Sequence, residues 1–115
     1  MSVYEVKAGR RFWSTLDSLR HKYPREQFAS IARTVKACIC ELQETGHVEE
    51  YGWNEHLLIK NPFASGTHFE FHIHDDDVLV VYCKRERNHV IRMVGVFDHE
   101  SIPRDKSALL YQHRE

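Results

Sequence analysis

The chain has 115 residues, of which 42% are hydrophobic and 29% charged, and its formal net charge is −1. These values predict one globular domain over residues 1–115 with a single buried core, and they show none of the charge excess of a strongly basic nucleic-acid binder. No apolar run approaches the roughly 20 residues of a membrane span, and the first residues lack the apolar core of a signal peptide. The three cysteines are an odd number and have no CxxC spacing, which indicates a reducing compartment rather than a disulfide framework. We therefore expect a cytoplasmic protein, and the lack of an apolar run predicts no membrane contact.

The first part of the chain predicts a leading strand and a helical hairpin. Residues 3–7 alternate as a short strand does. After Gly9, apolar residues recur at spacings of four, three and four, the period of a helix with one buried stripe; they are Phe12, Leu16, Leu19 and Tyr23. A second helix is predicted from Pro24, which suits a first turn, to Gly46, which suits a C-terminal cap. Its apolar face comprises Phe28, Ile31, Ala32, Val35, Cys38, Ile39 and Leu42.

After Gly46 the apolar period changes from that of a helix to that of strands. Residues 57–60 are predicted to form a short strand, and residues 61–66 are predicted to form a loop. The next strand places Phe69, Phe71 and Ile73 on one face. Residues 78–83 are almost all apolar, as in a central strand covered on both faces, and residues 90–97 form a third strand. We also allow for a short C-terminal helix through Leu109 and Leu110. The order predicts an α+β fold, with a leading strand, a helical hairpin, and then a three- to four-stranded antiparallel sheet.

Histidine and aspartate are concentrated on the other face of the strand that begins at residue 68, and in the turn after it. That face presents His68, Glu70, His72 and His74, and the turn at residues 75–77 consists of three aspartates. Neighbouring strands of a meander lie about 4.8 Å apart, so Arg92, Asp98 and His99 can reach the same surface. Histidine is the side chain most easily tuned across neutral pH, so this surface is the candidate for chemistry.

Two imidazoles beside a guanidinium supply what cleavage of RNA requires. A general base takes the proton from a ribose 2′-hydroxyl, this oxygen attacks the adjacent phosphate, and a general acid protonates the leaving 5′-oxygen. A cation stabilises the charge that builds on the phosphorane. Histidines suit the first two roles because burial and neighbouring carboxylates can move their pKa values apart. Arg92 suits the third role, with the helical Lys and Arg residues offsetting repulsion by the carboxylates.

Two other interpretations of the same residues stay open at this point. An alternating strand with its polar face in water gives the same pattern, and aspartates are common turn formers. Alternatively, His72 and His74 chelate a metal from one strand face, with Asp76 or His99 as a third ligand. The segment 72–77 begins like the metallo-β-lactamase motif HxHxDH, but it departs at the last position, and the chain is too short for that duplicated fold.

The segment from Gly66 to Ile102 carries the features by which the chain resembles the RelE/ParE superfamily of toxin–antitoxin toxins. Within it the likeness is greatest to YafQ-type ribosome-dependent mRNA interferases. The family shows a His-Ile pair, an acidic turn, a hydrophobic strand ending in Tyr-x-Lys, an arginine, and a Gly-Ser/Thr-His segment followed by a hydrophobic residue. The matching features here are His72-Ile73, the turn 75–77, the strand 78–84 ending in Tyr82-Cys83-Lys84, Arg92, and Phe97-Asp98-His99 with Ile102 beyond.

The resemblance implies an endoribonuclease that cuts mRNA in the ribosomal A site without a metal or other cofactor, and a cognate antitoxin protein that covers its site. The catalytic candidates are His72, His99, Arg92, Asp76 and Asp77. The candidates for substrate binding are His68, His74, Lys84 and Phe97. Two family features differ here. Asp-Asp-Asp replaces Pro-Asp-Trp in the turn, and Gly95 stands where the family has an arginine, which leaves Arg92 as the nearest substitute.

Two alternative functions accompany this prediction. A non-catalytic toxin of the ParE type would block a partner such as DNA gyrase, and a small His/Asp domain would bind a metal. Alanine at His72 and His99 separates the first alternative from a nuclease, because only the nuclease depends on the imidazoles.

Overall fold

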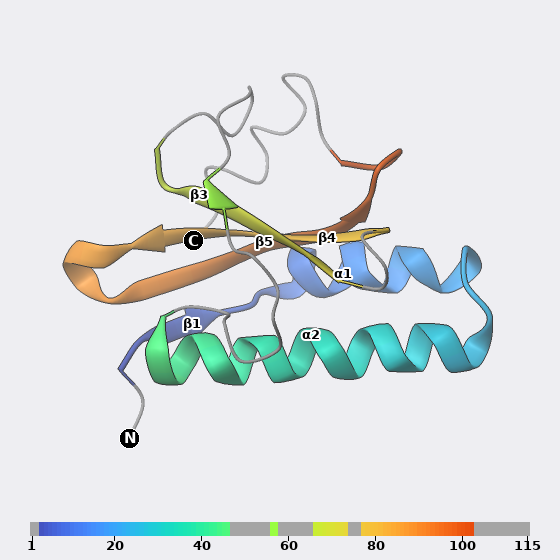
Figure 1. The fold of residues 1–115 in the computed structure, drawn as a ribbon, viewed down its shortest axis with the longest axis horizontal. Helices are drawn as coiled ribbons and strands as arrows, with labels where there is room; N and C mark the ends of the chain where they lie inside the picture. Colours follow the sequence, from blue (N-terminus) through green and yellow to red (C-terminus); the bar gives the residue numbers. More distant parts are fainter. Residues whose placement is uncertain (1–2, 47–55, 58–65, 74–76, 103–115) are drawn as a thin grey trace.

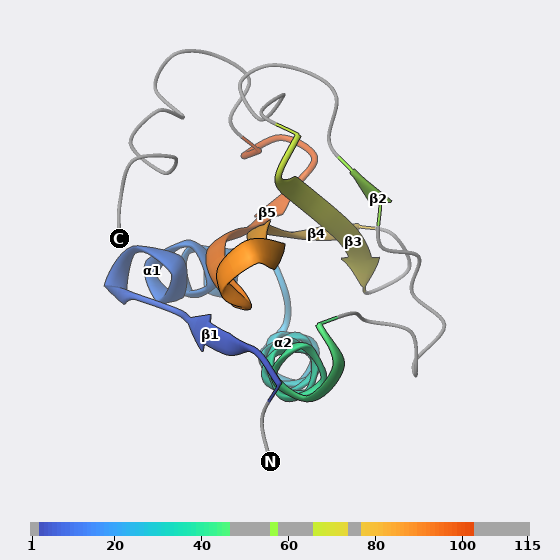
Figure 2. The same ribbon diagram turned by 90° about the vertical axis from the view of Figure 1, so that its left-hand side faces the viewer.

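A five-stranded sheet forms the centre of the fold, and both α-helices lie on one of its faces (Figures 1 and 2). The strands are ordered β1-β5-β4-β3-β2 across the sheet. The computed structural model describes residues 3–46, 56–57, 66–73 and 77–102. This part of the chain confirms the α+β class and the predicted order of leading strand, helical hairpin and antiparallel strands.

The helical hairpin follows the leading strand directly. Its elements are β1 (Glu5–Lys7), α1 (Arg10–Ser18), the 3₁₀ turn η1 (Leu19–His21) and α2 (Arg25–Thr45). The later elements are β2 (His56–Leu57), β3 (His68–Ile73), β4 (Val78–Arg85), the 3₁₀ turn η2 (Glu86–Asn88) and β5 (Val90–Asp98). Strand β2 is the described portion of the short strand predicted near residues 57–60, and the C-terminal helix predicted through Leu109 and Leu110 lies outside the described residues.

The leading strand makes the sheet mixed, because β1 runs parallel to β5 while the other neighbours are antiparallel. The parallel pairing extends from Glu5 opposite Val90 to Lys7 opposite Arg92. Beyond the residues of β5 that pair with β1, helix α1 contacts the edge of β5. The Thr15 hydroxyl accepts a hydrogen bond from the Val96 N–H at 2.8 Å and donates one to the Phe12 carbonyl at 2.6 Å. This contact ties the far half of β5 to the helices.

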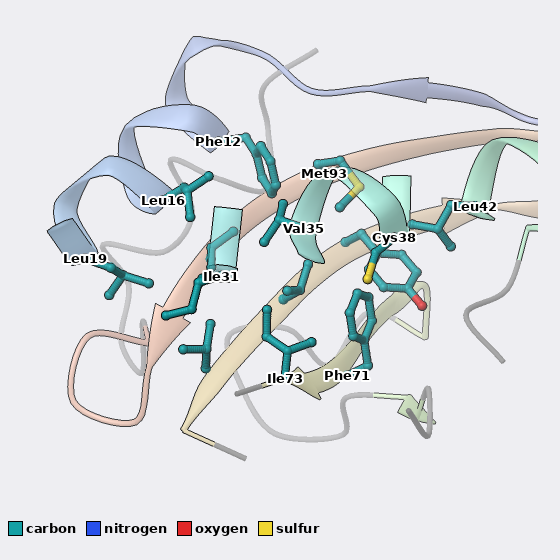
Figure 3. Packing of buried hydrophobic residues seen from close by; sticks show 14 of the residues in the cluster. Phe12, Leu16, Leu19, Ile31, Val35, Cys38, Leu42, Phe71, Ile73 and Met93 are labelled. Carbon is teal, nitrogen blue, oxygen red and sulfur yellow. The ribbon is translucent and has the colours of Figure 1, made fainter. Parts of the chain in front are cut away.

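The apolar stripes of the helices pack on the face of the sheet that the helices cover, and together they form the main core (Figure 3). The predicted stripe of Phe12, Leu16 and Leu19 is buried, and Tyr23 is half-buried. The second helix contributes Phe28, Ile31, Val35, Cys38 and Leu42, and the sheet contributes Phe71, Ile73, Val78, Val80, Tyr82, Ile91, Met93 and Val96. Burying one large apolar side chain stabilises a fold by about 1.5–3 kcal/mol, so this layer is the main source of stability.

Helix α2 ends at Gly46, as predicted, for two physical reasons. The backbone of Gly46 is left-handed with φ +79°, a conformation that favours glycine. A Cβ at this position would also strike the ring of Tyr4, which lies just before β1. At the other end of the helix, Pro24 stands one residue before the first turn rather than within it.

The face of the sheet opposite the helices, here called the distal face, is also covered. Val81, Cys83, Val94 and Phe97 form a second, smaller apolar cluster there. The alternation predicted for β3 is present, but His68 and Glu70 on its polar side are only 4% and 7% exposed. The interpretation of that side as a solvated strand face is therefore wrong for these two residues. The prediction that the central strand is covered on both faces is confirmed for residues 78–83.

Candidate histidine site

Strand register brings His72 and His99 together at one end of the distal face. His72 lies opposite Leu79 of β4, and Leu79 lies opposite Phe97 of β5. His99 follows Phe97 by two residues, and alternate residues of an extended chain share a face. The ring centroids of His72 and His99 are 5.9 Å apart, with their planes at 73°. The structure thus places side by side the two imidazoles that the sequence predicted to meet, and we call them the histidine pair.

Glu70 orients the ring of His72. Its Oε2 lies 3.1 Å from Nε2 of His72, and the two residues are neighbours on the distal side of β3. The Glu70 side chain is 10% exposed and that of His72 is 27% exposed. A buried carboxylate requires a hydrogen-bond donor, and this contact sets the direction of the second ring nitrogen of His72.

The turn after β5 is built around Asp98, and it carries His99. The Asp98 carboxylate accepts hydrogen bonds from the backbone N–H groups of Glu100 at 3.1 Å and Ser101 at 2.7 Å. The Asp98 N–H donates to the Ser101 hydroxyl at 3.1 Å, and the Ile102 N–H donates to the Asp98 carbonyl at 3.2 Å. His99 lies within this set of bonds, so its backbone position depends on Asp98.

Lys22, which follows η1, anchors this turn to the helical hairpin. Its Nζ lies 2.5 Å from Oδ2 of Asp98. Burial acts to raise the pKa of Asp98, but hydrogen bonds from Lys22 and Ser101 outweigh it and lower that pKa to about 2. The same hydrogen bond raises the pKa of Lys22. The two residues are therefore both charged at neutral pH, and the ion pair joins positions 76 residues apart.

Asp77 lies at the same end of the sheet, where it precedes β4 and is exposed. Burial raises the pKa of Tyr23, and the charges of Asp77 and then Asp98 raise it further. Two other predicted site residues, His74 and Asp76, lie outside the described residues.

Arg92 lies near the opposite end of β5. It stands opposite Cys83, which stands opposite His68. Five positions separate Arg92 from Phe97, which corresponds to about 15 Å along a strand. Burial, and after it the charge of Arg92, lowers the pKa of His68, so Arg92 acts on His68. Arg92 lies on the same face of the sheet as the histidine pair, but near the opposite end of β5. The prediction that Arg92 is the counter-charge of the histidine pair is therefore corrected.

The ring of Phe97 occupies the space that the side chain of the family's arginine would need at position 95. A Cβ on Gly95 would strike the ring of Phe97, two residues further along the same face. The ring thus covers the glycine, and Phe97 is only 3% exposed. Its predicted role in contacting a substrate requires an accessible ring, so this burial speaks against that role and indicates a packing role.

The other two described candidates for substrate binding are also separated from the histidine pair. Lys84 lies on the helix side of the sheet, where its Nζ is 4.7 Å from the centre of the Phe69 ring and the residue is 3% exposed. Phe69 in turn stacks on the core residue Tyr82 with centroids 6.1 Å apart. His68 is on the distal face but is buried at the start of β3. We therefore leave Lys84 and His68 out of the site.

The described part of the chain holds no group of three or more His, Cys, Asp or Glu side chains arranged to bind a metal ion. Of the ligands that the metal interpretation requires, His74 and Asp76 lie outside these residues. No helix within the described ranges is long and apolar enough to cross a membrane.

Sequence reasoning placed Glu70 and Asp98 on the candidate surface but gave them no structural role there, and it did not single out Lys22 from the other helical cations. The contact of Glu70 with His72 has a local signal, since residues two apart share a strand face. Asp98 is followed three positions later by Ser101, a pair that favours a side-chain-bonded turn. Lys22 has no local signal, because its partner is distant in the sequence.

The arrangement of elements defines the fold. A leading strand, a helical hairpin and an antiparallel meander form one sheet in which β1 lies beside the last strand, and a histidine follows that strand. This is the fold of the RelE-family toxins, so the resemblance is confirmed at the level of the fold, and the YafQ-type subclass stays a prediction.

Solved structures of known toxins share this fold. The chain is similar to a chain of the archaeal RelE–RelB complex from Pyrococcus horikoshii OT3, with 15% identity, 87% of this chain and 99% of that chain covered, and a TM-score of 0.51. A metal-bound toxin from Helicobacter pylori matches at 14% identity over 87% of this chain and 99% of that chain, with a TM-score of 0.51. A mutant of E. coli toxin RelE in the free state matches at 12% identity over 96% and 94%, with a TM-score of 0.50. No protein-family model and no curated protein matches the sequence.

Proposed function

We propose that this protein is the toxin of a type II toxin–antitoxin pair and that it cleaves messenger RNA at the histidine pair. The proposal depends on the contact between His72 of β3 and His99 of the turn after β5, two imidazoles with ring centroids 5.9 Å apart. One ring is half-buried and oriented by Glu70, and the other is exposed on an anchored turn. Imidazoles in this arrangement on a RelE-type toxin fold support acid–base cleavage of RNA.

Each step of the reaction has a group that can perform it. One imidazole removes the proton of the ribose 2′-hydroxyl, and the 2′-oxygen forms a bond to the adjacent phosphorus. The bond from phosphorus to the 5′-oxygen breaks, and the other imidazole, protonated beforehand, gives its proton to that oxygen. A hydrogen bond spans about 2.6–3.2 Å, so two rings this close can both reach oxygens of one phosphate. The products are a 2′,3′-cyclic phosphate and a 5′-hydroxyl, and no metal takes part.

The charge that develops on the phosphorane must be met by cations other than Arg92, which lies about 15 Å along the strand. The protonated imidazole supplies one positive charge next to the phosphate. In the ribosomal A site the message is already held by the ribosome, so a chain with a net charge of −1 needs no strongly basic surface of its own. A cognate antitoxin that covers the histidine pair would keep the toxin inactive.

Expression of the chain without an antitoxin tests this function. We expect growth arrest, together with ribosome-bound message that ends in 2′,3′-cyclic phosphate. His72→Gln and His99→Gln should each lower cleavage by at least about 100-fold, since general acid–base residues contribute about 10²–10⁴-fold. His89→Asn is the matched control, because it removes a histidine beyond the other end of β5 at a position with φ +53°, which asparagine tolerates. Intact message during a full arrest would contradict the proposal.

A non-catalytic toxin of the ParE type is the second candidate, and one observation favours it. Position 95 is a glycine packed against the Phe97 ring, so the cation that the family carries at that position is absent. A toxin of this kind would block a partner such as DNA gyrase. His72→Gln and His99→Gln would then leave toxicity unchanged, and the purified protein would inhibit gyrase supercoiling.

A further inference from the structure

Three cations from three strands line one cavity at the hairpin end of the distal face, where η2 joins β4 to β5. The cavity has a volume of about 140 Å³, and its lining residues are Lys7, Cys83, Arg85, Asn88, Val90 and Arg92. Lys7 lies opposite Arg92, and Arg92 lies opposite Cys83. Arg85 lies opposite Val90 in the next row of the same face. The register of the sheet therefore brings these cations together.

The lining chemistry fits a phosphate group. Arginine presents a planar set of N–H donors that matches phosphate oxygens, and lysine adds a point charge. Among the described residues, the lining includes three cations and no carboxylate, and Glu5 of β1 lies opposite the lining residue Val90. The described lining contains no aromatic side chain, and a nucleobase would therefore find no ring on which to stack.

The cavity and the histidine pair lie on the same face at opposite ends of the sheet. Lys7, Arg92, Cys83 and His68 form one row across four strands, whereas Phe97, Leu79 and His72 form the row at the pair. The two rows are about 15 Å apart along the strands. An RNA strand whose scissile phosphate lies at the pair can thus place another phosphate at the cavity after a few nucleotides.

We propose that this cationic cavity binds a second phosphate of the RNA strand that the histidine pair cleaves. The inference rests on the proposed function for the identity of the strand. With a net charge of −1, the protein can gain affinity for a polyanion only through local clusters of cations, because each neutralised phosphate releases counterions. The cavity would set the affinity and the register of the message, and the pair would do the chemistry.

Binding of a 2′-O-methyl decanucleotide to the full chain tests the cavity without any cleavage. Lys7→Gln combined with Arg85→Gln changes two exposed residues and removes two charges. Loss of one phosphate contact should lower the slope of log K against log salt by about 0.7, which weakens binding about fivefold at 0.1 M salt. The matched control is Arg33→Gln combined with Lys36→Gln, which removes the same charge from exposed positions of α2 and should bind as the parent protein does.

A series of strand lengths tests whether one strand reaches both sites. The affinity of the parent protein should rise once the strand spans the pair and the cavity, and Lys7→Gln/Arg85→Gln should lack that rise. An equal loss of binding in the cavity variant and the α2 control would overturn the proposal, because total charge would then explain it. So would a cavity that binds inorganic phosphate while decanucleotide affinity is insensitive to Lys7 and Arg85. Cavity-dependent binding without any cleavage would instead reject the nuclease function and keep the phosphate site.

Discussion

Replacing Asp98 by alanine tests whether the turn after β5 positions His99 for chemistry. The carboxylate accepts hydrogen bonds from the N–H groups of Glu100 and Ser101 and from the ammonium of Lys22. In the variant, water replaces the carboxylate at the two backbone groups, and the anchor to the helical hairpin is lost. His72 on β3 makes none of these contacts, so the perturbation acts on one member of the histidine pair.

The contacts set the size of the expected effect. A side chain that caps backbone N–H groups contributes about 0.5–2 kcal/mol, and the bonds of Asp98 to Glu100 and Ser101 lie at the surface. The free energy of unfolding should therefore fall by about 1 kcal/mol, which leaves a domain of ordinary stability folded. Cleavage should fall much further, since a misplacement of about 1 Å at a catalytic group costs on the order of 100-fold.

Cleavage of ribosome-bound message and chemical denaturation are measured on the same preparations of Asp98→Ala and Asp98→Asn. Asparagine keeps an acceptor for the backbone and should restore part of the activity. Asp17→Ala is the control, because it removes an exposed partner of Arg20 and should change neither quantity appreciably. If Asp98→Ala lost about 1 kcal/mol of stability and still cut RNA at the parent rate, the positioning role of the turn would be refuted.

Titration and packing give three further expectations. Because the folded pKa of Asp98 is lowered to about 2, its stabilisation should be complete above about pH 4 and should vanish as the pH falls towards 2; the stability difference between the parent and Asp98→Asn should follow that course. Because burial and Arg92 lower the pKa of His68, the protein should lose stability as the pH drops below about 6.5, and His68→Gln should not show this loss in denaturation curves. Gly95→Ala should destabilise the fold by about 1–3 kcal/mol because its Cβ meets the Phe97 ring. Phe97→Leu should recover part of that loss in the double variant, and strictly additive losses would contradict the contact.

The parts of the fold that were predictable are those set by local periodicity. The stripe of Phe12, Leu16 and Leu19 is buried because a helix repeats every 3.6 residues, and Gly46 ends α2 because it takes a left-handed backbone. The alternation of β3 placed His72 on the distal face. The meeting of His72 with His99 was predictable because it needs only this alternation and the meander order.

The features that could not be read locally depend on register and on long-range contacts. Strands β3 and β5 are both antiparallel to β4, so the two run in the same direction and the start of one lies level with the start of the other. Arg92, early in β5, therefore aligns with His68 rather than with His72. The ion pair of Lys22 with Asp98 joins distant segments that no sequence window contains. The burial of Phe97 follows from the lack of a side chain at Gly95.

The most direct test of RNA cleavage by the histidine pair is a single 2′-deoxy substitution in a message on programmed ribosomes. The cleavage position is first mapped with the unmodified message and the purified protein in the presence of EDTA. The deoxy nucleotide is then placed immediately 5′ of the scissile phosphate. We predict that cleavage at that phosphate stops, because the attacking oxygen is absent, while His89→Asn continues to cut the unmodified message. Cleavage at the deoxy position at the rate of the unmodified message would contradict the mechanism.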